Sequence, residues 1–411
     1  MNSDKPRHAP QSQFPVRDGH LHIGGIALPR LAQRVGRTPF YAYDRALLTA
    51  RARELRAALP AGLRLHYSLK ANPMPALVQH MSSLVDGLDV ASGGELKVAL
   101  DTGMQAQHIS FAGPGKTDAE LTQAIAAGAV LHLESLRELE SVARIGEALG
   151  LRPMVMLRIN PDFELKSSGM KMGGGPRQFG VDVEQAPQLL RRISELGLDW
   201  QGLHIFSGSQ CLNAQAIAET QSKTFELALR LADHAAQAPR LLNIGGGFGI
   251  PYFAGETALQ VGPIADNLAH WLPRAQAALG GATVALELGR YLVGEAGIYV
   301  TQVIDRKVSR GQVFLVTDGG MHHHLAASGN LGQVIRKNYP VAVGNRMNEK
   351  SGETVSVVGP LCTPLDMLAE RMELPAADVG DLIVIFQSGA YGCSASPSAF
   401  LGHPQALEVL V

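Results

Sequence analysis

The segment HYSLKAN, residues 66–72, ends a short apolar run on a lysine, Lys70. A lysine at the end of a strand is most often a solvated surface group. When an amine is desolvated or held beside other cations, its pKa falls, and it can then form a Schiff base with a carbonyl compound. Lys70 is therefore a candidate Schiff-base amine, provided that groups of matching chemistry lie nearby.

Two further segments can bind an anion. LLNIGGGFGIP, residues 241–251, holds four glycines within five positions, including Gly246 and Gly247. Glycines let backbone N–H groups approach a phosphate closely, although a plain flexible turn is equally compatible with the pattern. In GLHIFSGSQ, residues 202–210, Ser209 and the neighbouring amides can supply more donors.

LELGRYL, residues 286–292, sets Glu287, Gly289 and Arg290 at the end of another apolar run. A structural ion pair is the simplest interpretation of the two charges. Together with Lys70 and the glycine-rich segment, however, they form a set of a lysine, an anion cradle, a carboxylate and an arginine, all where strands stop.

The elements between these segments predict how they meet. From about residue 40 to 290, apolar runs alternate with stretches whose apolar residues recur at i, i+3, i+4 and i+7, as in amphipathic helices. Such an alternation of strand–helix units predicts an α/β fold, a (β/α)8 TIM barrel with its active site at the C-terminal ends of the strands. A doubly wound sheet is the alternative, but no dinucleotide-binding fingerprint follows the first strand.

The pattern of alternating strands and helices ends after residue 290. Short strands separated by turn residues predict a C-terminal all-β domain over 291–411. The strand-like residues 18–39 are expected to join that domain, and residues 1–17 to form a disordered tail.

Composition excludes several classes of protein. The formal net charge of −1 gives no electrostatic footprint for nucleic acid, and no apolar stretch is long enough to span a membrane. The three cysteines are too few for a disulfide framework, and no apolar signal run opens the chain. These features indicate a cytoplasmic protein.

Taken together, the motifs resemble those of the fold-type III decarboxylases that use pyridoxal 5′-phosphate (PLP) and act on diaminopimelate, ornithine and arginine. The resemblance runs from about residue 21 to 411. The matching motifs, in order, are YSLKAN, GLDVASGGEL, LRINPD, GSQ, NIGGGFG, ELGRYLVGEAG, GPLCTPLD and SGAYG.

The resemblance implies roles for residues at matching positions. Lys70 resembles the Schiff-base lysine, and Glu287 the carboxylate that pairs with the pyridine nitrogen. The remaining cofactor contacts that it implies are Asp89, Arg158, Ser209, Gly246, Gly247, Gly289, Arg290 and Tyr391.

Cys362 resembles a catalytic cysteine that reaches the site from the other subunit of a homodimer. Loss of CO2 leaves two electrons on Cα, and PLP accepts them best with its pyridine nitrogen protonated, which a buried carboxylate favours. A thiol such as that of Cys362 can then return a proton to Cα.

The sequence departs from the diamine-acting members at the substrate end. Thr363 stands where those relatives place an acidic residue that reads a distal ammonium, although Asp366 lies three residues on. The carboxylate-clamping Arg-Pro-x-Leu-Tyr stretch is absent from residues 318–330, and residues 166–178 form a glycine-rich insert with Lys171 and Arg177. An unpaired ammonium in a closed pocket is costly, so a substrate without a free distal charge is expected.

With these departures, the sequence resembles a subgroup of the family that is associated with exosortase-type polysaccharide clusters. That subgroup is related to enzymes that decarboxylate glutamate carried by an acyl carrier protein. The resemblance implies a place in exopolysaccharide biosynthesis and a tethered substrate, with the basic insert facing an acidic carrier. The alternatives are an authentic diaminopimelate or other diamino-acid decarboxylase, a racemase, which Glu287 disfavours, and a non-catalytic PLP-binding regulatory homologue.

Histidines raise two open questions. Relatives usually stack a histidine on the PLP ring, at the position of Phe206, while His204 lies two residues earlier on the same face. Either can stack, and Phe206 is slightly favoured.

If residues 322–324 form a strand, alternation would put His322 and His324 on one face; no partner completes a metal site there, and His323 is expected to line the substrate pocket.

Overall fold

The computed structural model describes residues 6–411, which divide into two compact units. One unit, called here the β unit, contains the chain up to Ala50 together with Pro251–Ala258 and Leu292–Val411. The other, called the barrel unit, contains Arg51–Ile250 and Leu259–Tyr291.

The barrel unit is built on eight parallel strands that close on themselves. Each strand pairs with the next in chain order; the last, β15, pairs with the first, β5, and this closes the barrel. The strands are β5 (Leu63–Ser68), β6 (Gly87–Val90), β7 (Ile109–Phe111), β8 (Val130–Leu133), β9 (Met154–Asn160), β12 (Asp199–Ile205), β14 (Leu241–Gly246) and β15 (Thr283–Leu288). The predicted (β/α)8 barrel is confirmed.

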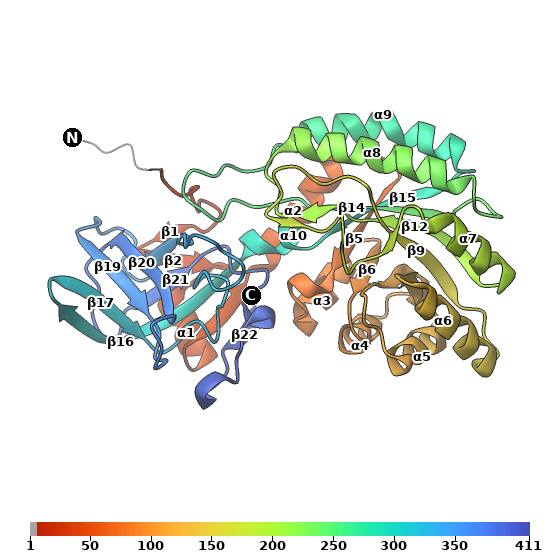
Figure 1. Ribbon diagram of the computed structural model, residues 1–411. Coiled ribbons are helices and arrows are strands. Elements are labelled where there is room, and N and C mark those ends of the chain that lie inside the picture. The colour runs from red at the N-terminus through yellow and green to blue at the C-terminus, as the bar shows by residue number, and fades with distance from the viewer. Residues whose placement is uncertain (1–5) are drawn as a thin grey trace. The chain divides into compact units, whose positions relative to one another are not determined.

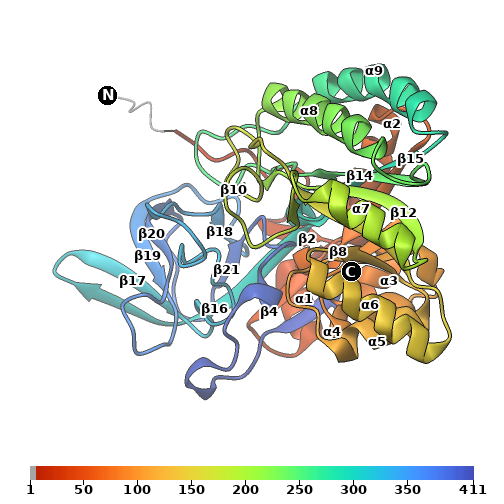
Figure 2. The same ribbon diagram turned by 45° about the vertical axis from the view of Figure 1, so that its right-hand side comes forward.

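Helices lie outside the barrel strands in Figures 1 and 2, as expected for this fold. Local sequence explains the start of α5: Thr117 Oγ1 accepts a hydrogen bond from the Glu120 backbone N–H, and the Glu120 carboxylate accepts one from the Thr117 backbone N–H, which completes a capping box. The helices are α2 (Arg45–Ala58), α3 (Pro75–Ser82), α4 (Gly93–Asp101), α5 (Asp118–Ala127), α6 (Leu136–Leu149), α7 (Ala186–Glu195), α8 (Ala214–Ala232), α9 (Gly262–Ala278) and α10 (Arg290–Val293), with 3-10 turns η1 (Leu69–Ala71) and η2 (Ala106–His108).

Short strands accompany the barrel. β11 (Val181–Asp182) extends β9, and β10 (Met170–Lys171) pairs antiparallel with β13 (Gly208–Ser209). The glycine-rich insert is thereby attached to the segment that carries Ser209.

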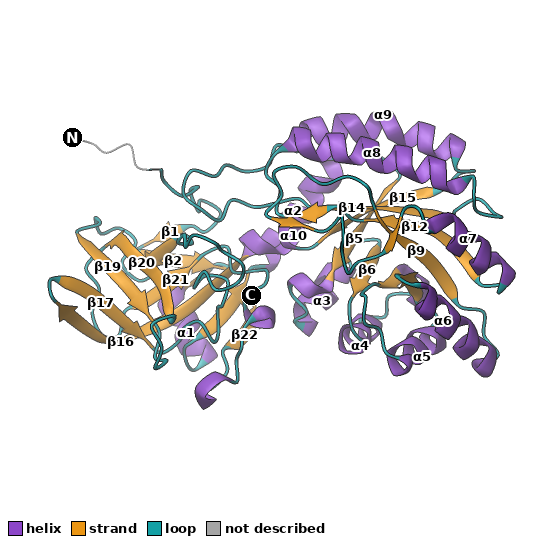
Figure 3. Cartoon of the chain, in the orientation of Figure 1, coloured by secondary structure: helices purple, strands orange, loops and turns teal. Residues whose placement is uncertain are grey.

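The β unit is mostly sheet, as the colouring of Figure 3 shows. Its central strand β16 pairs with β17, β21 and β4, and β4 also pairs with the C-terminal β22. The elements are β1 (Val16–Arg17), β2 (His20–Ile23), β3 (Ile26–Ala27), α1 (Leu28–Val35), β4 (Phe40–Tyr43), η3 (Gly294–Ala296), β16 (Gly297–Ser309), β17 (Gln312–Thr317), β18 (Val341–Val343), β19 (Glu353–Val358), β20 (Met367–Leu374), β21 (Leu382–Ile385), η4 (Cys393–Ala395), η5 (Phe400–Gly402) and β22 (Leu407–Leu410).

The N-terminal expectation needs correction. Residues 1–5 lie outside the described part, but Phe14 is buried in the core of the β unit, and β1 begins at Val16, so residues 6–17 are not a disordered tail throughout. The β unit also extends further than the expected 18–39, because β4 belongs to its sheet rather than to the barrel. Within residues 6–411, none of the helices combines the length and apolar character that a membrane span requires.

Candidate active site

Lys70 lies in η1, directly after β5, and therefore at the C-terminal end of a barrel strand. Its Nζ is 3.9 Å from Glu287 Oε1 and 5.4 Å from the centre of the Phe206 ring. The side chain remains 42% exposed, so the amine is open to a ligand as well as close to a carboxylate.

Glu287 stands near the end of β15, next to β5 in the barrel, and is 7% exposed. Ser68 Oγ donates to its Oε1 at 3.2 Å, and Asn243 Nδ2 to its Oε2 at 3.4 Å. Burial alone would raise the pKa of Glu287, but the contact with His204 and the charges of Lys70 and Arg158 hold that pKa well below its usual value. The carboxylate is therefore ionised and suited to pair with a protonated nitrogen.

The glycine-rich segment comes close to neighbouring backbone. Gly247 has a φ of 81°, and a Cβ there would lie 2.4 Å from the Gly208 carbonyl oxygen. A Cβ on Gly246 would meet the Glu287 carbonyl oxygen at 2.1 Å. Only glycine fits at these two positions, so the end of β14 presents bare backbone beside β13 and Ser209. Gly289 and Arg290 follow β15 directly, and Arg290 begins α10.

Asp89 and Arg158 are both held by neighbouring strands. The Asp89 Oδ1 atom accepts from Ser110 Oγ and lies 3.3 Å from His66 Nδ1. Its other oxygen, Oδ2, is buried without a hydrogen-bond partner among residues 6–411. Arg158 Nη1 donates to Glu134 Oε1 at 2.8 Å.

His204 and Phe206 have different surroundings. His204 is 1% exposed and lies against His132 and Glu287, whereas the Phe206 ring faces the Lys70 amine. This arrangement favours Phe206 over His204 as the side chain that stacks on a planar cofactor.

Several polar residues of this barrel end were not singled out from the sequence. They are all buried, and most lie on or just after barrel strands, whereas Lys116 lies in the loop before α5 and Glu138 in α6. Alternation along AVLHLES and HYSLKAN could have indicated His66, Ser68, His132 and Glu134. The full set is His66, Ser68, Ser110, Lys116, His132, Glu134, Glu138 and Asn243.

The donor set fits PLP. An amine, an ionised carboxylate, bare glycine backbone and the unpartnered Asp89 oxygen lie at the ends of neighbouring strands of one barrel. These are the groups that the aldehyde, the pyridine nitrogen and the phosphate of that cofactor need.

The remaining predicted residues lie in the β unit. Cys362 is exposed in the segment between β19 and β20, and Tyr391 follows β21 with an uncommon φ of 53°. Asp366 is 3% exposed and accepts backbone N–H groups from Met321 at 2.6 Å and Leu361 at 2.8 Å.

The histidine triplet is not a strand. Residues 321–323 form a turn, so the expectation of alternating faces is wrong. His323 is 2% exposed, and its Nε2 contacts the Pro404 carbonyl at 2.8 Å, which does not support a pocket-lining role. Burial holds the pKa of His322 and of His324 down to about 3. Among residues 6–411, no group of side chains has the arrangement of a metal site.

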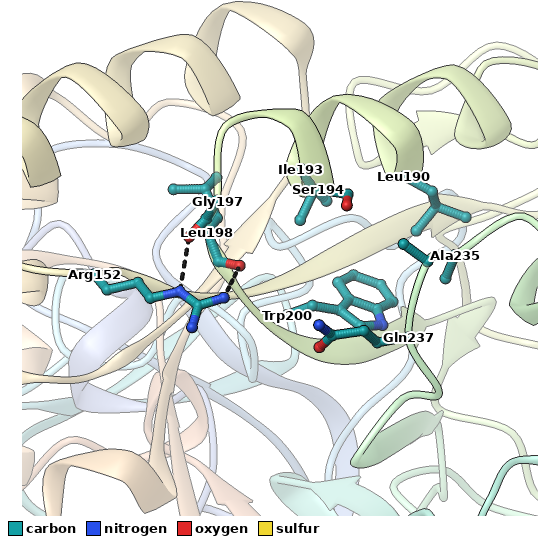
Figure 4. A pocket seen from close by; sticks show the side chains of 10 residues that line it. Arg152, Leu190, Ile193, Ser194, Gly197, Leu198, Trp200, Ala235 and Gln237 are labelled. Atoms are coloured by element: carbon teal, nitrogen blue, oxygen red, sulfur yellow. Dashed lines mark hydrogen bonds between the residues drawn. The ribbon is translucent and has the colours of Figure 1, made fainter.

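A pocket at the other end of the barrel is a different feature. It is lined by residues of α7, by the segment after α8, and by residues that precede or begin β9 and β12, among them Arg152 and Trp200, and has a volume of about 60 Å³ (Figure 4). Arg152 Nε donates to the Gly197 carbonyl there at 2.7 Å. Since barrel enzymes place their chemistry at the C-terminal ends of strands, this pocket is separate from the Lys70 site.

Comparisons with known proteins agree with this geometry. The family described as "Pyridoxal-dependent decarboxylase, pyridoxal binding domain" matches residues 45–294. The L-glutamyl-[BtrI acyl-carrier protein] decarboxylase of Niallia circulans is 39% identical over 91% of this chain and 88% of its own length. The diaminopimelate decarboxylase of Aquifex aeolicus is 33% identical over 96% of this chain and 91% of its own.

Among solved structures, diaminopimelate decarboxylase from M. jannaschii in complex with L-lysine superposes with a TM-score of 0.87 at 26% identity. The match covers 97% of this chain and 92% of that one. The family match, the barrel and the lysine–carboxylate pair at its strand ends lead to one conclusion: the chain belongs to the pyridoxal-dependent decarboxylases, enzymes whose cofactor is PLP.

Proposed function

We propose that this decarboxylase removes the α-carboxylate of an amino-acyl group tethered to an acyl carrier protein, rather than that of a free diamino acid. The observation that carries the proposal is the state of Asp366. It is the carboxylate in the segment 359–366, which also holds Cys362 and Thr363.

Asp366 is unavailable to a ligand ammonium. Both of its oxygens accept backbone N–H groups, and it is almost fully buried. The backbone also packs tightly against it, because a Cβ on Gly320 or Gly359 would lie 2.1 or 2.3 Å from its oxygens. With Thr363 in the place of an acidic reader, this segment offers no carboxylate to a distal ammonium.

Two further features support a tethered substrate. The relative from Niallia circulans acts on a glutamyl group carried by an acyl carrier protein. In this chain Lys166 and Arg177 are exposed in the glycine-rich insert, where they can face an acidic protein surface. Such contacts add affinity and speed of association without touching the reacting group.

Each site residue then has a task. When bound, PLP supplies the electron sink for the electrons left at Cα. We propose that Lys70 is the covalent attachment point, that Glu287 holds a proton on the pyridine nitrogen, and that bare backbone at Gly246 and Gly247, with Ser209, Arg290 and Tyr391, binds the phosphate. Cys362, supplied by the second subunit of a homodimer, returns a proton to Cα.

Cofactor attachment can be tested apart from substrate. Borohydride treatment of the purified protein should abolish its visible absorption and leave the label on the peptide that contains Lys70. A Lys70→Ala variant that still forms a reducible bond to the cofactor would show that the attachment point has been misassigned.

The substrate class is tested by CO2 release from a panel of compounds. The panel contains glutamyl-carrier thioester, glutamyl-pantetheine thioester, diaminopimelate, ornithine, lysine and arginine. We expect turnover of the thioesters and a kcat/KM for each free diamino acid well below ~10⁴ M⁻¹s⁻¹, the lower end for enzymes on their own substrates. Efficient use of free diaminopimelate would contradict the proposal.

The contribution of the insert is tested by charge reversal. Lys166→Glu with Arg177→Glu should lower kcat/KM for the carrier-bound substrate and leave the pantetheine thioester unaffected. Lys97→Glu, an exposed change on α4, is the matched control. Equal loss on both thioesters would show that the insert acts on the site itself.

Diaminopimelate decarboxylation is the second candidate, favoured by the relative from Aquifex aeolicus and by the likeness to the M. jannaschii structure. The same panel separates the two. A location in the cytoplasm and a place in exopolysaccharide biosynthesis remain proposals that rest on the sequence.

A further inference from the structure

Two buried histidines connect Glu287 with the far side of the barrel interior. His132 comes from β8, His204 from β12 and Glu287 from β15, so three separate strands supply the chain. The Nδ1 atoms of His132 and His204 lie 2.8 Å apart, and His204 Nε2 lies 3.2 Å from Glu287 Oε2. Both histidines are 1% exposed.

The protons on this chain can be counted. Two imidazole nitrogens 2.8 Å apart share one proton, since two lone pairs or two N–H groups would repel. An ionised Glu287 Oε2 at 3.2 Å favours a proton on His204 Nε2, because this nitrogen has no hydrogen-bond partner among residues 6–411 and two lone pairs at that distance would repel each other. The shared proton therefore belongs either to His132, which leaves both rings neutral, or to His204, which becomes a cation.

The surroundings favour the neutral pair. Lys116 and Arg158 are cations close to His132, and Lys116 Nζ donates to the His132 carbonyl at 2.9 Å. Burial, together with His204 and these cations, holds the pKa of His132 well below its usual value, so His132 itself is neutral whichever ring holds the shared proton. A cationic His204 would also give His132 an Nε2–H, and that atom has no hydrogen-bond partner in the described chain.

The other groups around Glu287 do not replace this control. Ser68 and Asn243 are neutral donors, and Lys70 would be engaged with the cofactor when the enzyme is loaded. Arg158 adds a positive charge near Glu287, but its Nη1 atom donates to Glu134. His66 lies opposite Glu287 on the neighbouring strand β5, but its Nδ1 atom is paired with Asp89 on β6.

We propose that His132 is a positioning residue: its Nδ1–H donates to His204 Nδ1, which fixes His204 as the tautomer with a proton on Nε2 and so holds Glu287 ionised and oriented for the pyridine nitrogen. His132 touches neither cofactor nor substrate in this role. It acts only through His204, as an outer partner that orients a ligating group.

The tautomers can be read directly in the cofactor-free protein. ¹⁵N NMR of histidine-labelled protein, with His132 and His204 assigned by substitution, should show both rings neutral near pH 7. His132 should carry its proton on Nδ1 and His204 on Nε2. A proton on His132 Nε2 and His204 Nδ1, or a cationic His204, in the wild-type protein would overturn the proposal. Variants are needed only to assign the signals.

Variants test the consequence. His132→Leu removes the donor, so His204 should sample both tautomers, and PLP affinity should fall by roughly tenfold, the scale of one buried hydrogen bond to a charged group. His132→Asn keeps an amide donor near the Nδ1 position and should restore both the His204 tautomer and most of the affinity. If His132→Leu does not fold, the spectra of wild-type protein and of His132→Asn still test the proposal, because a proton on His204 Nδ1 in either protein contradicts it. The proposal is also contradicted if His132→Leu folds and the tautomer of His204 is unchanged.

Discussion

Four side chains reach Glu287: Ser68, Lys70, His204 and Asn243. Their combined effect is an ionised carboxylate in a buried position, which is costly unless the negative charge meets a positive one. Under the proposed function, its partner is the protonated pyridine nitrogen of PLP.

We therefore expect Glu287→Gln to retain PLP but to lose roughly 10²-fold or more in kcat, the scale for one preorganised electrostatic group. The amide has the same shape but no charge to stabilise the pyridinium proton. Steady-state kinetics with the cofactor content measured by absorbance checks this. As a control, Glu140→Gln, which alters an exposed ion pair with Arg192, should leave kcat unchanged. An unchanged kcat in Glu287→Gln would refute the proposed role of Glu287.

Thr363 gives a residue-scale test of specificity. Thr363→Glu restores a carboxylate where diamine-acting relatives have one, so the ratio of kcat/KM for diaminopimelate or ornithine to that for the carrier-bound substrate should rise. Thr363→Gln is the matched control without charge. A ratio that rises equally in both variants would mean that size rather than charge reads the substrate.

At the scale of elements, the sequence was sufficient to predict the barrel and the strand ends that carry Lys70, Gly247 and Glu287, because the period of apolar residues and runs of glycine are local signals. It was insufficient to predict contacts between residues that are distant in the sequence. The contact of His132 with His204 joins residues 72 positions apart and exists only in the closed barrel. Likewise β4 is an apolar strand like those of the barrel, and only its pairing with β16 and β22 assigns it to the β unit.

Within the barrel unit, the glycine-rich insert pairs with the segment that carries Ser209, which the sequence did not predict. β10 pairs with β13, and the Met172 backbone N–H donates to the Ser207 carbonyl at 3.2 Å, so the insert supports the segment that carries Ser209. Met172→Pro removes that donor and should raise the Kd for PLP roughly two- to tenfold, the scale of one backbone hydrogen bond. Cofactor titration checks this, with Met172→Ala, which keeps the N–H, as control. Equal affinities for the two variants would show that the insert does not support the phosphate segment.

At the scale of the whole molecule, the proposed homodimer with shared sites leads to a quantitative prediction. Lys70→Ala and Cys362→Ala subunits are each expected to be inactive. Random exchange between them should restore about a quarter of the wild-type sites, since half of the dimers are mixed and each of those holds one intact site. Activity after mixing, with exchange verified by differently tagged subunits, is the measurement. Verified exchange without recovered activity would exclude a shared site.

The closure of the barrel by β5 and β15 has a further consequence, for stability. Lys70 follows one of these strands and Glu287 lies on the other, while His66 and Glu287 are paired across the seam. If PLP is held by both sides, as proposed, it binds only the closed barrel, so its binding free energy adds to the free energy of unfolding of that unit. At a free PLP concentration 100 times its Kd, the gain is about 2.7 kcal/mol. Calorimetry should show the barrel transition moving to higher temperature with PLP, and the enzyme's resistance to heat should then depend on the supply of the vitamin from which its cofactor is made.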